Sequence, residues 1–129
     1  MLFLGTAAAE CFPNPFCECP ACQEARRSSD RRLRRRRCSF LLSETAMIDF
    51  NADAMFACGE FGISLSRLKY VLLTHIHEDH FDYFSAYFPA MAATPTQPLA
   101  FFASPAACRG IEGSWRPSGK VPTASSPAR

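Results

Sequence analysis

Four side chains of the kinds that bind metal ions lie within six consecutive residues of this sequence. Residues 74–80 read Thr-His-Ile-His-Glu-Asp-His and contain all three histidines of the chain. Imidazole nitrogens and carboxylate oxygens are ligands that zinc, iron and manganese accept. A compact loop with this spacing directs His75 and His77 to one ion, and Asp79 and His80 to a second ion nearby. The segment therefore predicts a metal centre, in preference to a polar loop that contains histidines by coincidence.

A second group of metal-type ligands lies nearer the N-terminus, in the pattern Cys-x-Cys-x-x-Cys. Cys17, Cys19 and Cys22 offer three thiolates, which is typical of a structural zinc site whose fourth ligand comes from elsewhere. Residues 11–22 are expected to form a cysteine-rich metal-binding loop, in which Cys11 is the nearest local candidate for that ligand. Free buried thiols are the less favoured alternative, because the prolines of this segment leave few apolar neighbours. The remaining cysteines stand in apolar surroundings and are interpreted as core thiols: Cys38, Cys58 and Cys108.

The third group is a basic segment in which eight arginines fall within residues 26–37, with Glu24 and Asp30 as the nearby carboxylates. Such a segment binds the phosphates of nucleic acid or steers a substrate that carries phosphate. No aromatic residue is interleaved in it to stack on bases. A solvated loop or substrate steering is therefore favoured, and a nucleic-acid site between Arg31 and Arg37 stays open as the alternative.

Short apolar segments must position these three groups. Residues 2–6 read as a first strand, and residues 38–42 and 47–50 as the two strands of a hairpin. The unbroken apolar run over residues 70–74 predicts a strand that is buried on both faces and ends at the histidine cluster. Residues 99–102 read as a further strand.

Helices are expected between and after these strands. Asn51 is the expected N-cap of a helix over residues 52–60, which ends between two glycines. Its apolar stripe is expected to consist of four residues: Ala52, Met55, Phe56 and Cys58. Aromatic residues at helical spacing predict an amphipathic helix over residues 81–88 that ends near Pro89, and a short helix is expected to start at Pro105.

The composition fits one ordinary domain. The chain has 129 residues, of which 48% are hydrophobic and 20% charged, and a net charge of +2. We expect a domain over residues 1–111 and a disordered tail over residues 112–129, where Ser, Pro, Gly and Ala predominate. No apolar stretch approaches the roughly 18 residues of a membrane span, and the N-terminus lacks a secretion signal, so a cytoplasmic location is expected. Seven cysteines fit thiols and metal thiolates in a reducing compartment.

Together these motifs resemble the metallo-β-lactamase superfamily of metal-dependent hydrolases, in which the same histidine and aspartate run follows a hydrophobic strand. Residues 3–6, 17–22, 31–37 and 48–50 are similar to the branch that contains the phosphodiesterase of phosphonate degradation. The resemblance covers residues 2–111. It implies an α/β fold, namely the N-terminal half of an αβ/βα sandwich with a mixed sheet and flanking helices.

The resemblance also implies roles for individual residues. His75 and His77 would bind a first metal, and Asp79 and His80 a second, with Asp79 also near the attacking water. Asp49 resembles a carboxylate that hydrogen-bonds a ligand histidine and orients it. The implied metals are zinc, manganese or iron at this centre, and a structural zinc at the cysteines. In the resembling branch the fourth ligand of the cysteine site is a histidine far along the chain, and no histidine follows His80 here.

The superfamily completes its metal centre with histidines and a bridging aspartate from the second half of the sandwich. After residue 80 this sequence offers only Asp82 and Glu112 as carboxylates. Each metal would keep two protein ligands, whereas catalytic zinc normally has three. We therefore expect a shortened chain with weak or no activity. The open face and edge of its sheet should promote self-association.

Three functions follow as hypotheses. The first is hydrolysis of a small phosphodiester or related ester by a metal-activated water. The second is a non-catalytic fragment that binds zinc through its cysteines. The third is a basic module that binds nucleic acid through the segment between Arg31 and Arg37.

Overall fold

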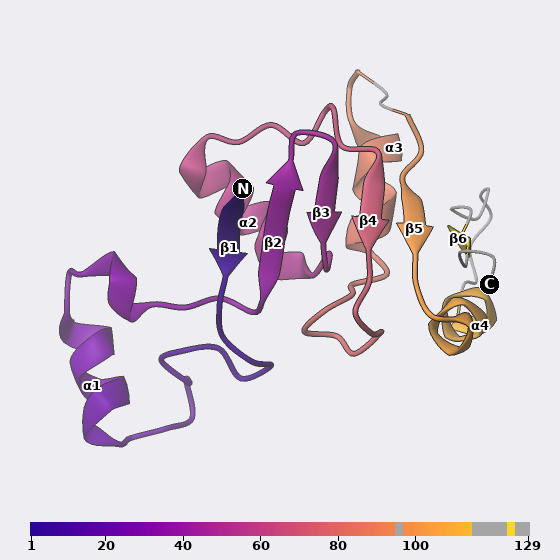
Figure 1. Ribbon diagram of the computed structural model, residues 1–129. Helices are drawn as coiled ribbons and strands as arrows, with labels where there is room; N and C mark the ends of the chain where they lie inside the picture. The colour runs from indigo at the N-terminus through magenta and orange to yellow at the C-terminus, as the bar shows by residue number, and fades with distance from the viewer. Residues whose placement is uncertain (95–96, 115–123, 126–129) are drawn as a thin grey trace.

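A six-stranded mixed sheet forms the centre of the molecule (Figure 1). The computed structural model describes residues 1–94, 97–114 and 124–125. The strands lie side by side in chain order: β1 (Leu2–Gly5), β2 (Ser39–Ser43), β3 (Ala46–Ile48), β4 (Tyr70–Leu72), β5 (Ala100–Phe102) and β6 (Ala124–Ser125). The first three strands pair antiparallel, and β3 to β6 pair parallel. This mixed α/β architecture was predicted from the sequence, and the predicted hairpin is β2–β3.

The strand register separates a buried row of side chains from an exposed one. Met47, Val71 and Phe101 are direct partners on β3, β4 and β5, and all three are fully buried. The next row on the opposite face, which we call the open row, is also apolar and comprises Phe3, Phe40, Ile48, Leu72 and Phe102. Because side chains alternate between the faces of a strand, Leu72 is 41% exposed beside buried Val71. The prediction that this strand is buried on both faces was therefore wrong.

The helix α2 (Ala52–Phe61) covers the buried row. Asn51 caps it, since its side chain accepts a hydrogen bond from the N–H of Ala54, and Gly62 ends it in the left-handed conformation. Small residues face the sheet, namely Ala54, Ala57 and Cys58. The predicted stripe was wrong at Phe56, whose side chain is 74% exposed, because the buried face follows the spacing 54, 57, 58.

The remaining helices are short. They are α1 (Pro20–Arg27), the 3₁₀ turns η1 (Arg31–Leu33) and η2 (Ser85–Tyr87), α3 (Phe88–Met91) and α4 (Pro105–Ser114). The predicted helix over residues 81–88 was wrong. A 3₁₀ turn stands there, and Pro89 lies in the first turn of α3, where its missing N–H leaves no hydrogen bond unmade. Residues 11–22, predicted as a loop, end in the first residues of α1.

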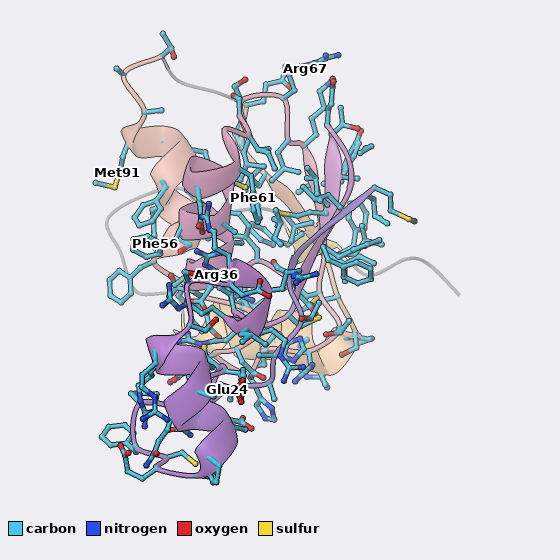
Figure 2. The ribbon with its side chains drawn as sticks, turned by 90° about the vertical axis from the view of Figure 1, so that its left-hand side faces the viewer. Glu24, Arg36, Phe56, Phe61, Arg67 and Met91 are labelled. Carbon is cyan, nitrogen blue, oxygen red and sulfur yellow. The ribbon has the colours of Figure 1, made fainter. Side chains whose placement is uncertain are left out.

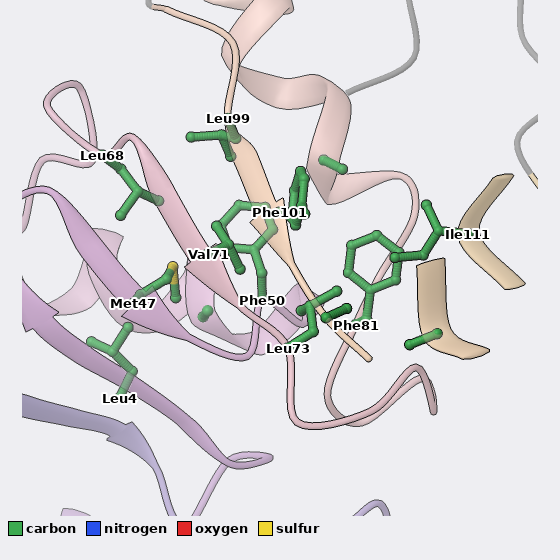
Figure 3. Packing of buried hydrophobic residues seen from close by; sticks show 14 of the residues in the cluster. Leu4, Met47, Phe50, Leu68, Val71, Leu73, Phe81, Leu99, Phe101 and Ile111 are labelled. Carbon is green, nitrogen blue, oxygen red and sulfur yellow. The ribbon is translucent and has the colours of Figure 1, made fainter. Parts of the chain in front are cut away.

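The core fills the space between the sheet, α2 and the segment after β4 (Figure 3). Phe50, Phe81 and Phe101 form its aromatic centre. The ring centroid of Phe101 lies 6.5 Å from that of Phe50 and 5.5 Å from that of Phe81, both in edge-to-face geometry. Phe50 and Phe81 also pair through a backbone bridge. The core therefore anchors the two segments that flank the histidine cluster.

Part of the predicted disordered tail has regular structure, since α4 extends to Ser114 and Ala124–Ser125 pairs with β5. Residues 115–123 and 126–129 lie outside the described residues, so disorder there stays a prediction. Within the described part of the chain, none of the helices has the length and apolar character of a membrane span.

Candidate metal centre

The histidine cluster leaves the sheet beside the segment that follows β3. Because β3 and β4 are parallel, their carboxyl ends meet at one edge of the sheet, which is where α/β sheets carry their sites. Backbone hydrogen bonds hold the two segments together, from Asp49 to Leu72 (2.9 Å) and from Phe50 to His80 (2.8 Å). The cluster is thus a loop closed at both ends against the strand-β3 segment.

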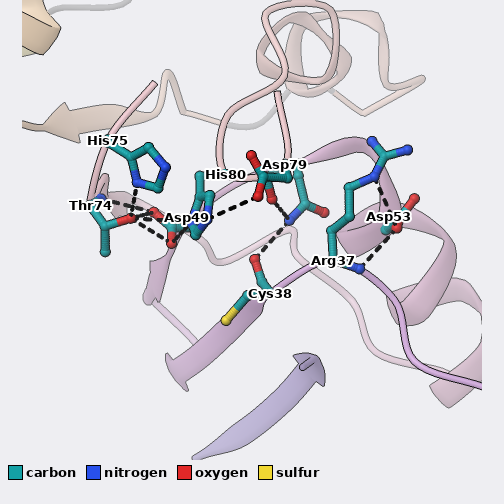
Figure 4. Close-up of polar contacts among 9 residues, drawn as sticks. Arg37, Cys38, Asp49, Asp53, Thr74, His75, Asp79 and His80 are labelled. Carbon is teal, nitrogen blue, oxygen red and sulfur yellow. Dashed lines mark hydrogen bonds and ion pairs between the residues drawn. The ribbon is translucent and has the colours of Figure 1, made fainter. Parts of the chain in front are cut away.

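Three of the four predicted ligands converge. The ligand atoms of His75, Asp79 and His80 all lie within 4.8 Å of one another (Figure 4). The ring centroids of His75 and His80 are 3.9 Å apart, and Nε2 of His80 is 3.3 Å from Oδ2 of Asp79. The ring of His77 lies 4.8 Å from that of His75, outside this group of three. The division of the four ligands between two ions stays a prediction.

Asp49 fixes the orientation of His80. Its fully buried carboxylate lies 2.6 Å from Nδ1 of His80 and accepts hydrogen bonds from the N–H (2.8 Å) and hydroxyl (2.9 Å) of Thr74. Because a carboxylate only accepts hydrogen bonds, Nδ1 of His80 is the donor in this contact, and Nε2, on the side of Asp79, is the ring atom left to bind a metal ion. This is the geometry that the role inferred for Asp49 requires. Asp49 has a φ of 57°, a conformation that aspartate adopts more readily than bulkier residues.

The donor set fits a metal ion. Bonds of about 2.1 Å to a tetrahedral ion place neighbouring ligand atoms roughly 3.4 Å apart. Nε2 of His80 and Oδ2 of Asp79 are 3.3 Å apart, the ligand atoms of all three residues lie within 4.8 Å of one another, and the orientation of His80 is fixed before an ion binds. His75, Asp79 and His80 would therefore hold one ion with small movements, and the described residues supply three of its ligands.

Asn51 supports the loop from behind. Its fully buried side chain donates hydrogen bonds to the carbonyls of Cys38 (2.8 Å) and Asp79 (2.7 Å), while its oxygen caps α2. The cap was predicted from the sequence, whereas the contact with Asp79 was not. The contact joins residues 28 positions apart, and a local pattern gives no sign of it.

An open pocket of about 630 Å³ borders the cluster. His77 and Asp79 line it from the histidine cluster, and Arg37 lines it from the arginine segment. Arg37 lies 3.7 Å from the carboxylate of Asp53, which also accepts a hydrogen bond from the Arg37 N–H (Figure 4). Burial opposes the charge of Arg37, but Asp53, Cys11 and Asp79 outweigh it and raise the pKa of the guanidinium. A permanent positive charge therefore stands beside the metal-type donors.

The cysteine cluster forms at the start of α1. The sulfurs of Cys17, Cys19 and Cys22 lie within 4.8 Å of one another. Cys19 precedes the first turn, where the backbone N–H of Cys22 and the neighbouring thiols lower its pKa. Burial raises the pKa of Cys22. A lowered pKa favours the thiolate that binds metal, so Cys19 is the member of the group best prepared as a ligand.

Cys11 was the wrong candidate for a fourth ligand. Its thiol donates to the carboxylate of Asp53 (3.4 Å), and among the described residues it is not in the cysteine group. The three cysteines interpreted as core thiols differ in burial. Cys58 and Cys108 are buried, while Cys38 is partly buried.

The arginine segment is more ordered than the predicted solvated loop. The carbonyl of Arg36 accepts hydrogen bonds from the N–H groups of Thr6 (3.0 Å) and Ala7 (2.7 Å), and Arg35 exchanges two with Phe12 (2.7 and 2.9 Å). Gly5 permits this approach, because a Cβ there would lie 2.0 Å from the carbonyl oxygen of Arg37. Residues 34–37 are therefore held as an extended segment against the N-terminal loop.

Known proteins match this chain in fold. Comparison with protein-family models finds no match, and comparison with curated proteins finds no similar sequence. Among solved structures, a diphosphatase of the PhnP family matches at a TM-score of 0.66 and 23% identity, covering 86% of this chain and 43% of that chain. Zn²⁺-bound PqqB from Methylobacterium extorquens matches at a TM-score of 0.66 and 20% identity, covering 88% of this chain and 40% of that chain.

Both solved structures have the metallo-β-lactamase fold. The chain therefore has part of this fold, which confirms the fold expected from the sequence. It spans about two-fifths of the length of the structures that it matches.

Proposed function

Starting from this partial metallo-β-lactamase fold, we propose that the chain is a metal-dependent hydrolase that acts on a small phosphodiester or a related ester. The observation that carries the proposal is the convergence of His75, Asp79 and His80, with His80 oriented by Asp49. The diphosphatase among the similar structures supports phosphate chemistry, and the Zn²⁺-bound one supports zinc. Manganese and iron suit the same donors.

The residues of the chain would have the following roles in hydrolysis. A divalent ion, when bound, lowers the pKa of a water and draws charge from a phosphate oxygen. Asp79 would accept a proton from the attacking water, since its carboxylate has a second oxygen besides the one near His80. Arg37, which lines the adjoining pocket, would bind the negative charge of the substrate. With two ions bound, His75 and His77 would hold one, and Asp79 and His80 the other.

Turnover of bis-p-nitrophenyl phosphate tests this proposal. We expect the chain loaded with Zn²⁺ or Mn²⁺ to release p-nitrophenol, and we expect EDTA to stop the reaction. Asp79→Asn should reduce the rate about 100-fold or more, because it removes the proton acceptor. Glu44→Gln is the matched control, since Glu44 is exposed and paired with Arg67. A metal-loaded chain with no release above that of free metal would refute hydrolysis.

The second candidate function is a non-catalytic, zinc-binding fragment. The cluster of Cys17, Cys19 and Cys22 favours it, because it needs neither Asp79 nor the histidines. It predicts one tightly held zinc without turnover. A cytoplasmic location stays a prediction for either function.

We also propose that the open row is covered by a second copy of the chain. Its apolar side chains cross neighbouring strands from β1 to β5 and are exposed or partly exposed, and an apolar surface of this kind favours association. Leu72→Lys places a charge within it and should shift the chain toward monomer in light scattering over a concentration series. Phe56→Lys, on the outer side of α2, should leave association unchanged. A wild-type chain that stays monomeric at all concentrations would contradict the proposal.

A further inference from the structure

A basic groove lies where the arginine segment meets β1 and the end of α2. It encloses about 430 Å³, and its described lining residues include none of residues 74–80. Five arginines from the η1 turn and the segment after it line the groove: Arg31, Arg32, Arg34, Arg35 and Arg36. The groove is therefore separate from the metal-type donors and from the pocket that borders them.

The groove keeps an excess of positive charge after its ion pairs are counted. Arg31 and Arg36 both pair with Glu60, and Arg32 pairs with Asp30 at 2.8 Å. Within the described part of the chain, Arg34 and Arg35 have no carboxylate partner. Arg34 donates to the carbonyl of Ser28 (3.1 Å), and the guanidinium of Arg35 lies over the ring of Phe12. Five guanidinium groups against two carboxylates favour an anionic ligand with more than one negative charge.

These charges are held in place before a ligand arrives. The backbone of residues 34–37 is tied to Thr6, Ala7 and Phe12 by hydrogen bonds, and Glu60 fixes two of the guanidinium groups. A solvated loop would lose conformational entropy when it closes on an anion. The backbone of residues 34–37 is already ordered, so it would lose little conformational entropy on binding. Holding several guanidinium groups close together costs free energy, because like charges repel. A bound anion would offset that repulsion.

Aromatic side chains line the same groove. Phe61, at the end of α2, is 51% exposed, and Phe3, on β1, is 62% exposed. The arginine segment itself contains no aromatic residue, but the fold brings two to the groove from other elements. Exposed rings beside guanidinium groups provide a stacking surface for a planar base next to a binding site for phosphates.

We propose that the basic groove binds a nucleotide, with the base against Phe61 and the phosphates at Arg34 and Arg35. The volume lies within the range of about 300–1,000 Å³ that small-ligand sites have, and it suits one nucleotide better than a long strand. The same chemistry could come from a free nucleoside diphosphate or from one unit of a single-stranded nucleic acid. The size of the groove favours the free nucleotide.

Isothermal titration calorimetry of the full chain with ADP tests the proposal, with EDTA present so that the metal centre does not contribute. We expect Arg34→Gln and Phe61→Ala each to weaken ADP binding about 10-fold or more, because one removes a phosphate contact and the other the stacking surface. The matched controls are Arg67→Gln, an exposed arginine elsewhere, and Phe56→Ala, an exposed phenylalanine of the same helix. Figure 2 labels Arg36 and Phe61 at the groove, and Phe56 and Arg67 outside it.

Several outcomes would overturn the nucleotide site. One is the absence of binding heat with ADP at millimolar concentration. Another is an equal loss of ADP affinity in Arg67→Gln and Arg34→Gln, and a third is an ADP affinity that Phe61→Ala leaves unchanged. Much tighter binding of an eight-residue oligothymidylate than of ADP, with a steep salt dependence, would assign the groove to nucleic acid instead. Thermal unfolding of each variant shows that it is folded. Phe61→Ala, at an exposed helix end, carries the test if Arg34→Gln does not fold.

Discussion

Replacing His75 and His80 together by alanine is expected to abolish metal binding at the edge formed by β3 and β4, and to leave the cysteine site loaded. The two imidazoles are two of the three donors that lie within 4.8 Å of one another. Changes to residues that merely orient a ligand reduce metal affinity about 10- to 100-fold, so the loss of two direct ligands should exceed about 100-fold. Metal content by plasma mass spectrometry, after dialysis against dilute Zn²⁺, measures the loss.

Two further variants make this result specific. Cys17→Ser with Cys19→Ser should remove the other zinc and leave the histidine site occupied, because the two groups share no residue. Asp49→Asn should have a metal content between those of wild type and the double histidine variant. Its metal affinity should be reduced about 10- to 100-fold, because the amide binds Nδ1 of His80 less strongly than the carboxylate does. Unchanged metal content in the double histidine variant would show that these donors bind no ion.

Elements whose evidence is local were predicted well from the sequence. The β2–β3 hairpin follows from two short apolar runs around a turn, and α2 from a capping Asn51 and a closing Gly62. Predictions that depended on the rest of the fold did not succeed. The apolar run at β4 gave no sign that its alternate side chains are exposed, because burial depends on what covers each face of the sheet.

The metal-type donors were also predictable, because they lie close together in the sequence. His75, His77, Asp79 and His80 lie within six residues, so the sequence shows them as one group. Their supports come from elsewhere in the chain. Asn51 reaches Asp79 across 28 positions, and Arg37 enters the adjoining pocket from the arginine segment. A local pattern contains no information on such contacts, since they depend on which strands become neighbours.

The arginine segment connects the two proposed sites. Arg36 lines the basic groove, while Arg37 lines the pocket beside Asp79. One short segment thus supplies positive charge to two separate places, a division that the run of arginines in the sequence does not show.

Replacing Asn51 by alanine is expected to destabilise the chain by about 2–4 kcal/mol. The loss of the N-cap contributes about 1 kcal/mol. The carbonyls of Cys38 and Asp79 would lose their donor inside the protein, at a cost of about 1–3 kcal/mol. Urea unfolding followed by circular dichroism measures the change. Ser64→Ala, which removes an exposed hydroxyl contact with Ser66, is the control and should stay within about 0.5 kcal/mol.

Asn51→Asp separates the two roles of this side chain. The aspartate keeps an oxygen for the N–H of Ala54, so α2 stays capped, but it has no N–H for the carbonyl of Asp79. We expect it to reduce metal affinity as well as stability, because the main chain that carries Asp79 loses its support. Equal stability of Asn51→Asp and wild type would show that the contacts with Cys38 and Asp79 contribute little, and that the loop is held by Asp49 and the backbone alone.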